Sequence, residues 1–242
     1  MKIRIKFTKL GAAKFIGHLD VMRYFQKAIR RADIGIRYSE GFSPHQIMSF
    51  AAPLGVGIES DGEYLDIDVT PEEDGQRLKE RLNAVMAEGF EILDCRRLPD
   101  SAANAMSIVA AADYELRLRP GYEMADPHQW MKGLLDFYGQ EKVLVSKKTK
   151  KGEKQLDLKQ LVYELSLLED EAGPGLRMKI STGSSENIKP ELVLDAYYQS
   201  LGQERPAFAW MARRKEVYAD LAGDHRFVSL MDLGEEIEPW KD

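Results

Sequence analysis

The sequence predicts an α+β protein made of two ferredoxin-like (βαββαβ) domains in tandem. Three observations favour this fold class: segments in which apolar and polar residues alternate, segments with apolar residues on one helical face, and an order of strand, helix, two strands, helix and strand that occurs twice. The chain has 242 residues, of which 44% are hydrophobic and 31% charged. It is therefore long enough for one large core or two small ones.

The first half begins with KIRIKFT, whose alternation predicts a half-buried strand. A helix is expected from about 18 to 32, because apolar residues there recur every three or four positions. GEYLDIDVT predicts another alternating strand. TPEEDGQRLKERLNAVMAEG predicts a helix with Thr70 as the N-cap and Pro71 at the first helical position. FEILDCRRL then closes the first unit as a strand.

The second half repeats this order. ADYELRLRP is expected to be a strand, PHQWMKGLLDFYG a helix, and KVLVSKK and KQLVYELSLL two strands around a charged connection. GLRMKIST is expected to continue the sheet, KPELVLDAYYQSLG to form a helix, and AFAWMARRKEVYA to form a final strand. Between the halves, DSAANAMSIVAAA is weakly patterned and predicts a boundary. The expected domains are 1–100 and 108–222, followed by an acidic C-terminal tail at 223–242.

The composition argues against several kinds of site. Cys95 is the single cysteine, which excludes an intramolecular disulfide and an iron–sulfur cluster held by thiolates of this chain alone. The four histidines are scattered and form no metal-binding motif, so no metal or cofactor is expected here. No apolar run reaches the roughly 20 residues of a membrane helix, and the N-terminus lacks a secretory apolar segment, which predicts a cytoplasmic protein.

Charge is distributed unevenly along the chain. The net charge is −6, yet the first 37 residues contain ten basic side chains and only two acidic ones. Arg23, Lys27 and Arg30 form a contiguous stripe on the predicted helix, and Arg31 and Arg37 follow closely. Such asymmetry indicates an anionic partner such as RNA, although a solvated helix face would have the same pattern.

The segment RYSEGFSPHQIMSFAAPLGVG, at 37–57, allows two interpretations. As a structural turn it would use Gly41 for a positive φ, with Pro44, Pro53 and Gly55 stiffening or bending the chain. As a ligand surface it would offer more polar groups than a turn requires. A second basic turn lies in the other half. The predicted substrate or RNA contacts of the chain are Arg23, Lys27, Arg30, Arg31, Arg37, Tyr38, Ser43, His45, Lys147, Lys148, Lys150 and Lys151.

Several of these motifs together resemble a known family. GHLD at 17–20, YSEGFSPH at 38–45, PLGVGIES and the later STGSSENIKPELVL are similar to the radical-SAM-associated bacterial proteins of unknown function, in their free-standing form. Ser43 stands where the family often carries Asn. The resemblance implies a radical SAM partner, and S-adenosylmethionine, an iron–sulfur cluster and any cobalamin would belong to that partner. This chain would then bind or position a substrate without catalysing the reaction itself.

Two other functions remain open. The first is a metal-independent ribonuclease that uses His18 and His45 with Tyr38 as a helper, by distant likeness to the paired ferredoxin-like domains of CRISPR RNA-processing endonucleases. The second is a protein-interaction module that docks a partner through the acidic tail and exposed Trp210 and Trp240. The resemblance and the basic N-terminal half favour an accessory protein that binds RNA or a phosphate-bearing substrate.

Overall fold

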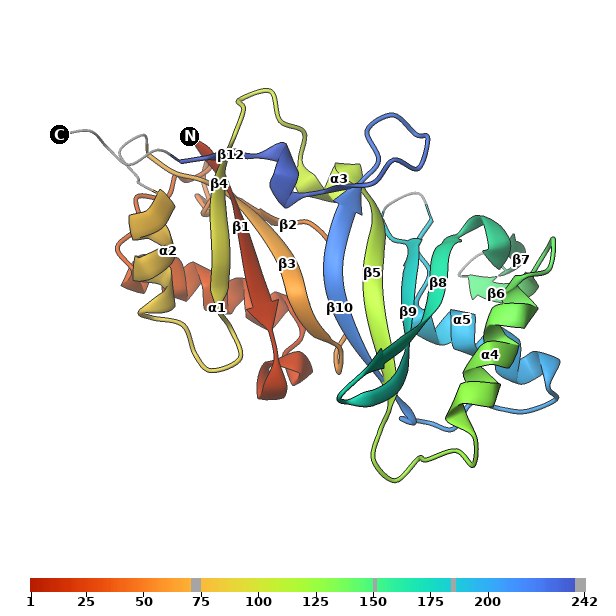
Figure 1. Cartoon of the computed structure of the whole chain (residues 1–242). Coiled ribbons are helices and arrows are strands. Elements are labelled where there is room, and N and C mark those ends of the chain that lie inside the picture. Colours follow the sequence, from red (N-terminus) through yellow and green to blue (C-terminus); the bar gives the residue numbers. More distant parts are fainter. Residues whose placement is uncertain (71–74, 150–151, 184–185, 238–242) are drawn as a thin grey trace. The chain divides into compact units, whose positions relative to one another are not determined.

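The computed structural model has a mixed α+β architecture, as predicted (Figure 1). The structure describes residues 1–70, 75–149, 152–183 and 186–237. The chain divides into two compact units: unit 1 comprises residues 1–110 and 214–242, and unit 2 comprises residues 111–213. Unit 1 is therefore built from two separated stretches of sequence. Among the described helices, none has both the length and the apolar character of a membrane span.

Unit 1 takes most of its elements from the first stretch and receives further strands from the second. Its elements are β1 (Lys2–Lys9), η1 (Gly11–Phe15), α1 (His18–Arg31), β2 (Met48–Phe50), β3 (Glu59–Asp68), α2 (Gly75–Asn83), β4 (Ile92–Leu98), α3 (Ala105–Ile108), the later part of β10 (Trp210–Ala219), β11 (Val228–Ser229), η3 (Met231–Leu233) and β12 (Glu235–Glu236). The order β4-β1-β3-β2 is antiparallel throughout. The end of the chain adds β12 to the outer edge of β4.

The core of unit 1 follows from the alternation in β1. Ile3, Ile5 and Phe7 all point to one face of the sheet and are at most 1% exposed. Apolar side chains of α1 and α2, such as Phe25 and Leu78, pack against them. Burial of this apolar surface is the main stabilising contribution to the unit.

The other face of β1 carries charged residues that are also covered. Arg4 is only 1% exposed, and its Nε and Nη2 each donate to the Asp66 carboxylate on β3 at 2.8 Å. Its Nη1 donates to the Leu230 carbonyl at 2.8 Å. The predicted tail at 223–242 thus includes a segment that closes over this face, because the buried guanidinium needs acceptors that the strands alone do not supply.

Unit 2 is built on antiparallel strands and two helices. Its elements are β5 (Val109–Leu118), which begins just before the boundary, α4 (Pro127–Tyr138), β6 (Leu144–Thr149), β7 (Gly152–Asp157), η2 (Leu158–Gln160), β8 (Val162–Asp170), β9 (Gly173–Ser181), α5 (Pro190–Ser200) and the beginning of β10. β9 pairs with both β5 and β8. Within the described residues, β6 pairs with β7 as a separate two-stranded ribbon. The predicted charged connection therefore contains a strand of its own, β7.

Candidate functional site

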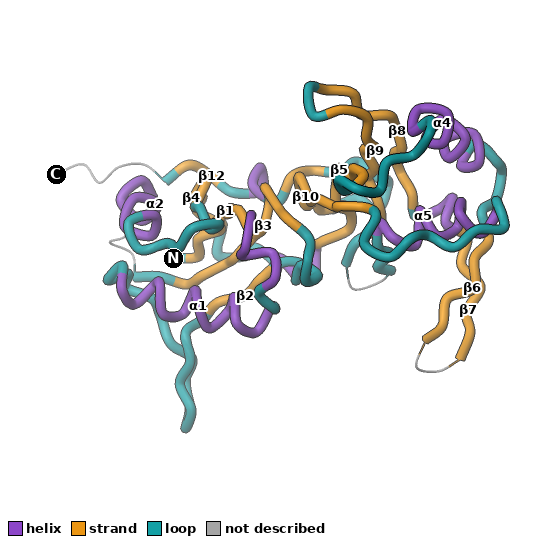
Figure 2. The backbone as a smooth tube through the Cα atoms, turned by 90° about the horizontal axis from the view of Figure 1, so that it is seen from below, coloured by secondary structure: helices purple, strands orange, loops and turns teal. Residues whose placement is uncertain are grey.

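The predicted ligand loop folds as a hairpin between α1 and β2. Tyr38 and Gln46 form an isolated bridge, and the Ser39 N–H donates to the His45 carbonyl at 2.8 Å. Gly41 at the tip has a φ of 107°, a conformation that glycine adopts readily. Figure 2 shows this loop reaching away from the rest of unit 1. The segment is therefore a turn and also a projecting surface.

The hairpin is anchored on α1 and presents aromatic rings. Gln46 is buried, and its Nε2 donates to the Gln26 carbonyl of α1 at 3.3 Å. Phe42 is fully exposed at the tip, Tyr38 is 50% exposed, and Ser43, which follows Phe42, is also exposed. Exposed rings on a backbone held at its base are suited to stacking on flat groups of a ligand.

The four basic residues of α1 differ in what they contact. Arg23 is paired with an aspartate one turn earlier at 3.1 Å. Arg31 donates to a backbone carbonyl just after α2, also at 3.1 Å. Lys27 and Arg30 are exposed and have no ion pair within the described part of the chain. These two residues are the cations of α1 that remain available to a ligand.

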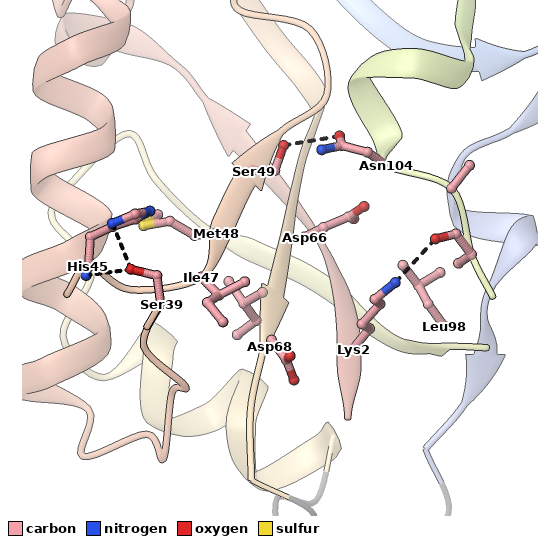
Figure 3. A pocket seen from close by; sticks show the side chains of 13 residues that line it. Lys2, Ser39, His45, Ile47, Met48, Ser49, Asp66, Asp68, Leu98 and Asn104 are labelled. Atoms are coloured by element: carbon pink, nitrogen blue, oxygen red, sulfur yellow. Dashed lines mark hydrogen bonds between the residues drawn. The ribbon is translucent and has the colours of Figure 1, made fainter. Parts of the chain in front are cut away.

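A cavity of about 390 Å³ lies beside the hairpin, within unit 1 (Figure 3). Its floor is formed by residues of β1, β2 and β3, including Lys2 and Asp66, and it is bordered by Leu98 and by residues 102–104. Ser39 and His45 line the end nearest the hairpin. The volume falls in the usual range for sites that bind small molecules.

The border of this cavity is tied to the strands by hydrogen bonds. The Ser49 hydroxyl on β2 donates to the Asn104 Oδ1 at 3.1 Å. The Lys2 ammonium donates to the carbonyls of Asp100 and Ala102 at 3.1 and 3.2 Å. Because these bonds join segments far apart in sequence, the cavity is preformed by the fold.

The charges around this cavity are largely balanced by protein groups. Asp66 binds Arg4, as described above, and Asp68 lies 3.2 Å from the N-terminal amine and 3.5 Å from the Arg37 guanidinium. Arg37, predicted to contact a ligand, thus pairs within unit 1. The His45 Nδ1 lies 2.9 Å from the hydroxyl of Ser39. That hydroxyl also accepts the His45 backbone N–H, so a local turn explains the contact without catalysis.

His18 lies at a different cavity from His45. It begins α1, its ring centroid is 5.3 Å from that of Phe50, and it lines a cavity of about 10 Å³ together with Lys9 and Glu63. Burial, followed by the nearby Lys9 ammonium, lowers the pKa of His18. The structure therefore does not bring the two imidazoles to one cavity, which cleavage of a single phosphodiester would require.

A buried ionic cluster surrounds this small cavity and was not predicted. Arg214 on β10 is 2% exposed, and its Nη2 lies 2.6 Å from both carboxylate oxygens of Glu63. Lys9 is also 2% exposed, donates to the Ile16 carbonyl at 2.7 Å, and has its pKa lowered by burial. One feature of the sequence did point to this cluster: the alternation of β1 places Lys9 on the side that faces the core. Arg214 lies too far along the chain for any local pattern to reveal the pair.

The four predicted turn residues lie at bends or in exposed loops. Gly41 occupies the hairpin tip, and Pro44 is exposed next to it. Pro53 lines the small cavity beside His18, and the Gly55 carbonyl accepts the Ile58 N–H at 3.4 Å. The turn interpretation thus accounts for these positions.

The second basic turn belongs to unit 2. Lys147 and Lys148 lie on β6, opposite Lys154 and Glu153 of β7. Lys150 and Lys151 lie outside the described residues, as does Trp240. Trp210, predicted to be exposed, is buried instead, and its Nε1 donates to the Tyr198 hydroxyl at 3.3 Å. In the described part of the chain, no group of three or more metal-ligating side chains is found.

Comparison with known proteins places residues 2–190 in a family model described as "uncharacterized protein conserved in bacteria (DUF2344)". No curated protein matches the chain. Among solved structures, a chain from a structure titled "Crystal Structure of a Cbf5-Nop10-Gar1 Complex" is similar, with a TM-score of 0.47 and 11% identity. The match covers 89% of this chain and 48% of that chain, so this chain spans about half the length of its structural neighbour.

Proposed function

We propose that this chain, which belongs to the DUF2344 family of uncharacterised proteins conserved in bacteria, binds RNA or a phosphate-bearing substrate through unit 1 and serves a radical SAM enzyme. The observation that carries the RNA proposal is the neighbourhood of α1 and the hairpin. Lys27 and Arg30 are exposed cations without a described ion pair, and the hairpin anchored on the same helix presents Tyr38 and Phe42.

These groups supply the two interactions that single-stranded RNA needs. Cations neutralise phosphates and release counterions, and exposed rings stack on unpaired bases. The antiparallel order β4-β1-β3-β2, with α1 after β1 and α2 after β3, also supports a ferredoxin-like assignment for unit 1. The separate cavities of His18 and His45 favour binding over ribonuclease activity.

A binding titration with single-stranded RNA at several salt concentrations tests this function. We expect Lys27→Ala combined with Arg30→Ala to reduce the slope of log affinity against log salt by about 1.4, since each phosphate contact contributes about 0.7. Phe42→Ser should weaken binding by about 1–3 kcal/mol if one base stacks on the ring.

The matched control combines Arg97→Ala with Lys132→Ala. It removes the same two charges from exposed positions on β4 and α4, so the slope should stay that of the unmodified protein. Absence of RNA binding at low salt would contradict the proposal. If both double variants lose the same amount of slope, the loss comes from the lower net charge and not from contacts of Lys27 and Arg30 with RNA.

The radical SAM partner is proposed from the sequence resemblance and the cysteine count. Cys95 is buried, and burial raises its pKa to about 12, so its thiolate is poorly available to iron. The cluster, S-adenosylmethionine and any cobalamin would therefore be held by the partner. The affinity-tagged full chain should retain a protein with three closely spaced cysteines, identified by mass spectrometry.

Retention of this partner should survive ribonuclease treatment if the two proteins contact each other directly. A second outcome, in which ribonuclease releases the partner, would mean that RNA bridges the two proteins. If the captured proteins lack a cluster motif in repeated experiments, the partner proposal fails while the RNA proposal stands.

A further inference from the structure

Unit 2 contains a cavity of about 740 Å³ that plays no part in the function proposed above. Residues 122–126, α4, α5 and residues 203–209 contribute to its lining. This volume lies within the range of roughly 300–1,000 Å³ that is typical of sites for small organic ligands. The chemistry of its lining indicates which class of ligand fits.

Aromatic rings form one part of the lining. The ring centroid of Trp130 on α4 lies 4.9 Å from those of Tyr197 and Tyr198 on α5. The Trp130 Nε1 is buried and has no hydrogen-bond acceptor among the described residues. Trp130, Tyr197 and Tyr198 therefore give this part of the cavity a flat apolar surface, which favours a ligand with an aromatic ring.

The polar part of the lining is acidic or neutral. Glu123 accepts the Gly121 N–H at 2.7 Å, which lowers its pKa, and Asp126 accepts the Gln129 N–H at 2.9 Å. Gln129 and Gln203 add two side-chain amides. The described lining residues include neither lysine nor arginine. Such a lining favours a ligand with amino groups and disfavours a phosphate.

The cation whose charge acts on Tyr198 is already neutralised. Burial raises the pKa of the Tyr198 hydroxyl, the hydrogen bond from Trp210 and the charge of Arg205 act in the opposite direction, and the Arg205 Nε lies 2.6 Å from Asp195. A phosphate would therefore have to displace a carboxylate to gain this partner. Arg205 therefore leaves the preference for an amino-bearing ligand unchanged.

We propose that this cavity binds an amino-substituted nitrogen heterocycle without a phosphate, such as a free amino-nucleoside. The ring stacks against the aromatic side chains that line the cavity, and the amino group donates to Glu123 or Asp126. The side-chain amides of Gln129 and Gln203 bind the remaining edge of the heterocycle.

Calorimetric titration of the full-length chain tests this proposal. Adenosine and cytidine carry the amino group, inosine and uridine replace it with a carbonyl, and AMP adds a phosphate. We expect at least one amino-nucleoside to bind and its carbonyl analogue and phosphorylated form to bind less tightly. Glu123→Gln combined with Asp126→Asn removes both carboxylates, keeps a residue at 126 that can cap α4, and should weaken binding of the amino-nucleoside by about fivefold.

The matched control combines Glu141→Gln with Glu171→Gln, which removes two carboxylates from exposed positions of unit 2 outside the cavity and should leave nucleoside binding unchanged. The proposal is overturned if neither amino-nucleoside binds at millimolar concentration. It is also overturned if AMP binds as tightly as adenosine, or if Glu123→Gln combined with Asp126→Asn binds like the unmodified chain. The variants of Lys27 and Arg30 lie in unit 1 and should leave nucleoside binding unchanged, so this test and the RNA test fail independently.

Discussion

Two side chains of unit 1, Lys9 and His18, stand in surroundings that oppose their charged forms. For Lys9 burial lowers the pKa most, Glu63 partly offsets this, and Arg214 lowers it further. For His18 burial is again the largest cause, and the Lys9 ammonium adds to it. The cluster already combines two cations, Lys9 and Arg214, with the single carboxylate of Glu63, so a proton on His18 adds a further positive charge without a partner.

This arrangement predicts a pH dependence of stability. The folded pKa of His18 lies below its ordinary value of about 6.5, so the unfolded chain binds the proton more readily. The free energy of unfolding should fall as the pH decreases from about 6.5 through the folded pKa. Urea denaturation between pH 7.5 and 5 measures this dependence, and His18→Gln should remove its histidine component.

The control for this experiment is His128→Gln. His128 is an exposed histidine of α4 in unit 2, far in sequence from the ionic cluster. It should keep the pH dependence of the unmodified chain. Should His18→Gln lose as much stability on acidification as the unmodified chain does, the loss would originate in other groups.

At the scale of single elements, local patterns explain most of the helices and strands. The helix expected at 18–32 is α1 (His18–Arg31), and the helix expected in PHQWMKGLLDFYG is α4 (Pro127–Tyr138). Both have apolar residues at helical spacing, and Asp126 caps α4 by accepting the Gln129 N–H. Such features depend on neighbours in sequence, so the sequence alone reveals them.

Pairing between elements is harder to predict, because it depends on contacts across the chain. The sequence predicts KVLVSKK and KQLVYELSLL as two strands around a charged connection, whereas β6 pairs with β7, a strand that lies within this connection. The same limit applies to the candidate site. Sequence spacing identifies Arg31 and Arg37 as ligand contacts, whereas a carbonyl after α2 and the Asp68 carboxylate occupy their guanidinium groups. The sequence also could not show that Lys27 and Arg30, unlike their neighbours, have no ion pair within the described part of the chain.

At the scale of the whole molecule, unit 1 is discontinuous, which the weak boundary pattern at 100–112 does not reveal. The sequence separates a first domain at 1–100 from a tail at 223–242, whereas contacts in the structure group residues 214–242 with residues 1–110. Tyr64 on β3 illustrates how residues 1–110 depend on contacts with residues 214–242. Its hydroxyl lies 2.5 Å from the Glu216 carboxylate and 3.2 Å from the Ser229 hydroxyl.

We therefore predict that a fragment of residues 1–110 lacks a cooperative thermal transition. Without residues 214–242, the buried carboxylate of Glu63 loses Arg214 and the buried guanidinium of Arg4 loses the Leu230 carbonyl. Removing one partner of a buried ion pair costs about 3–5 kcal/mol, a large share of the 5–15 kcal/mol that stabilises a typical domain. Circular dichroism should show that fusing 214–242 to the fragment through a flexible linker restores the transition. If the fragment and the fusion unfold at the same temperature, residues 214–242 are dispensable for folding of unit 1.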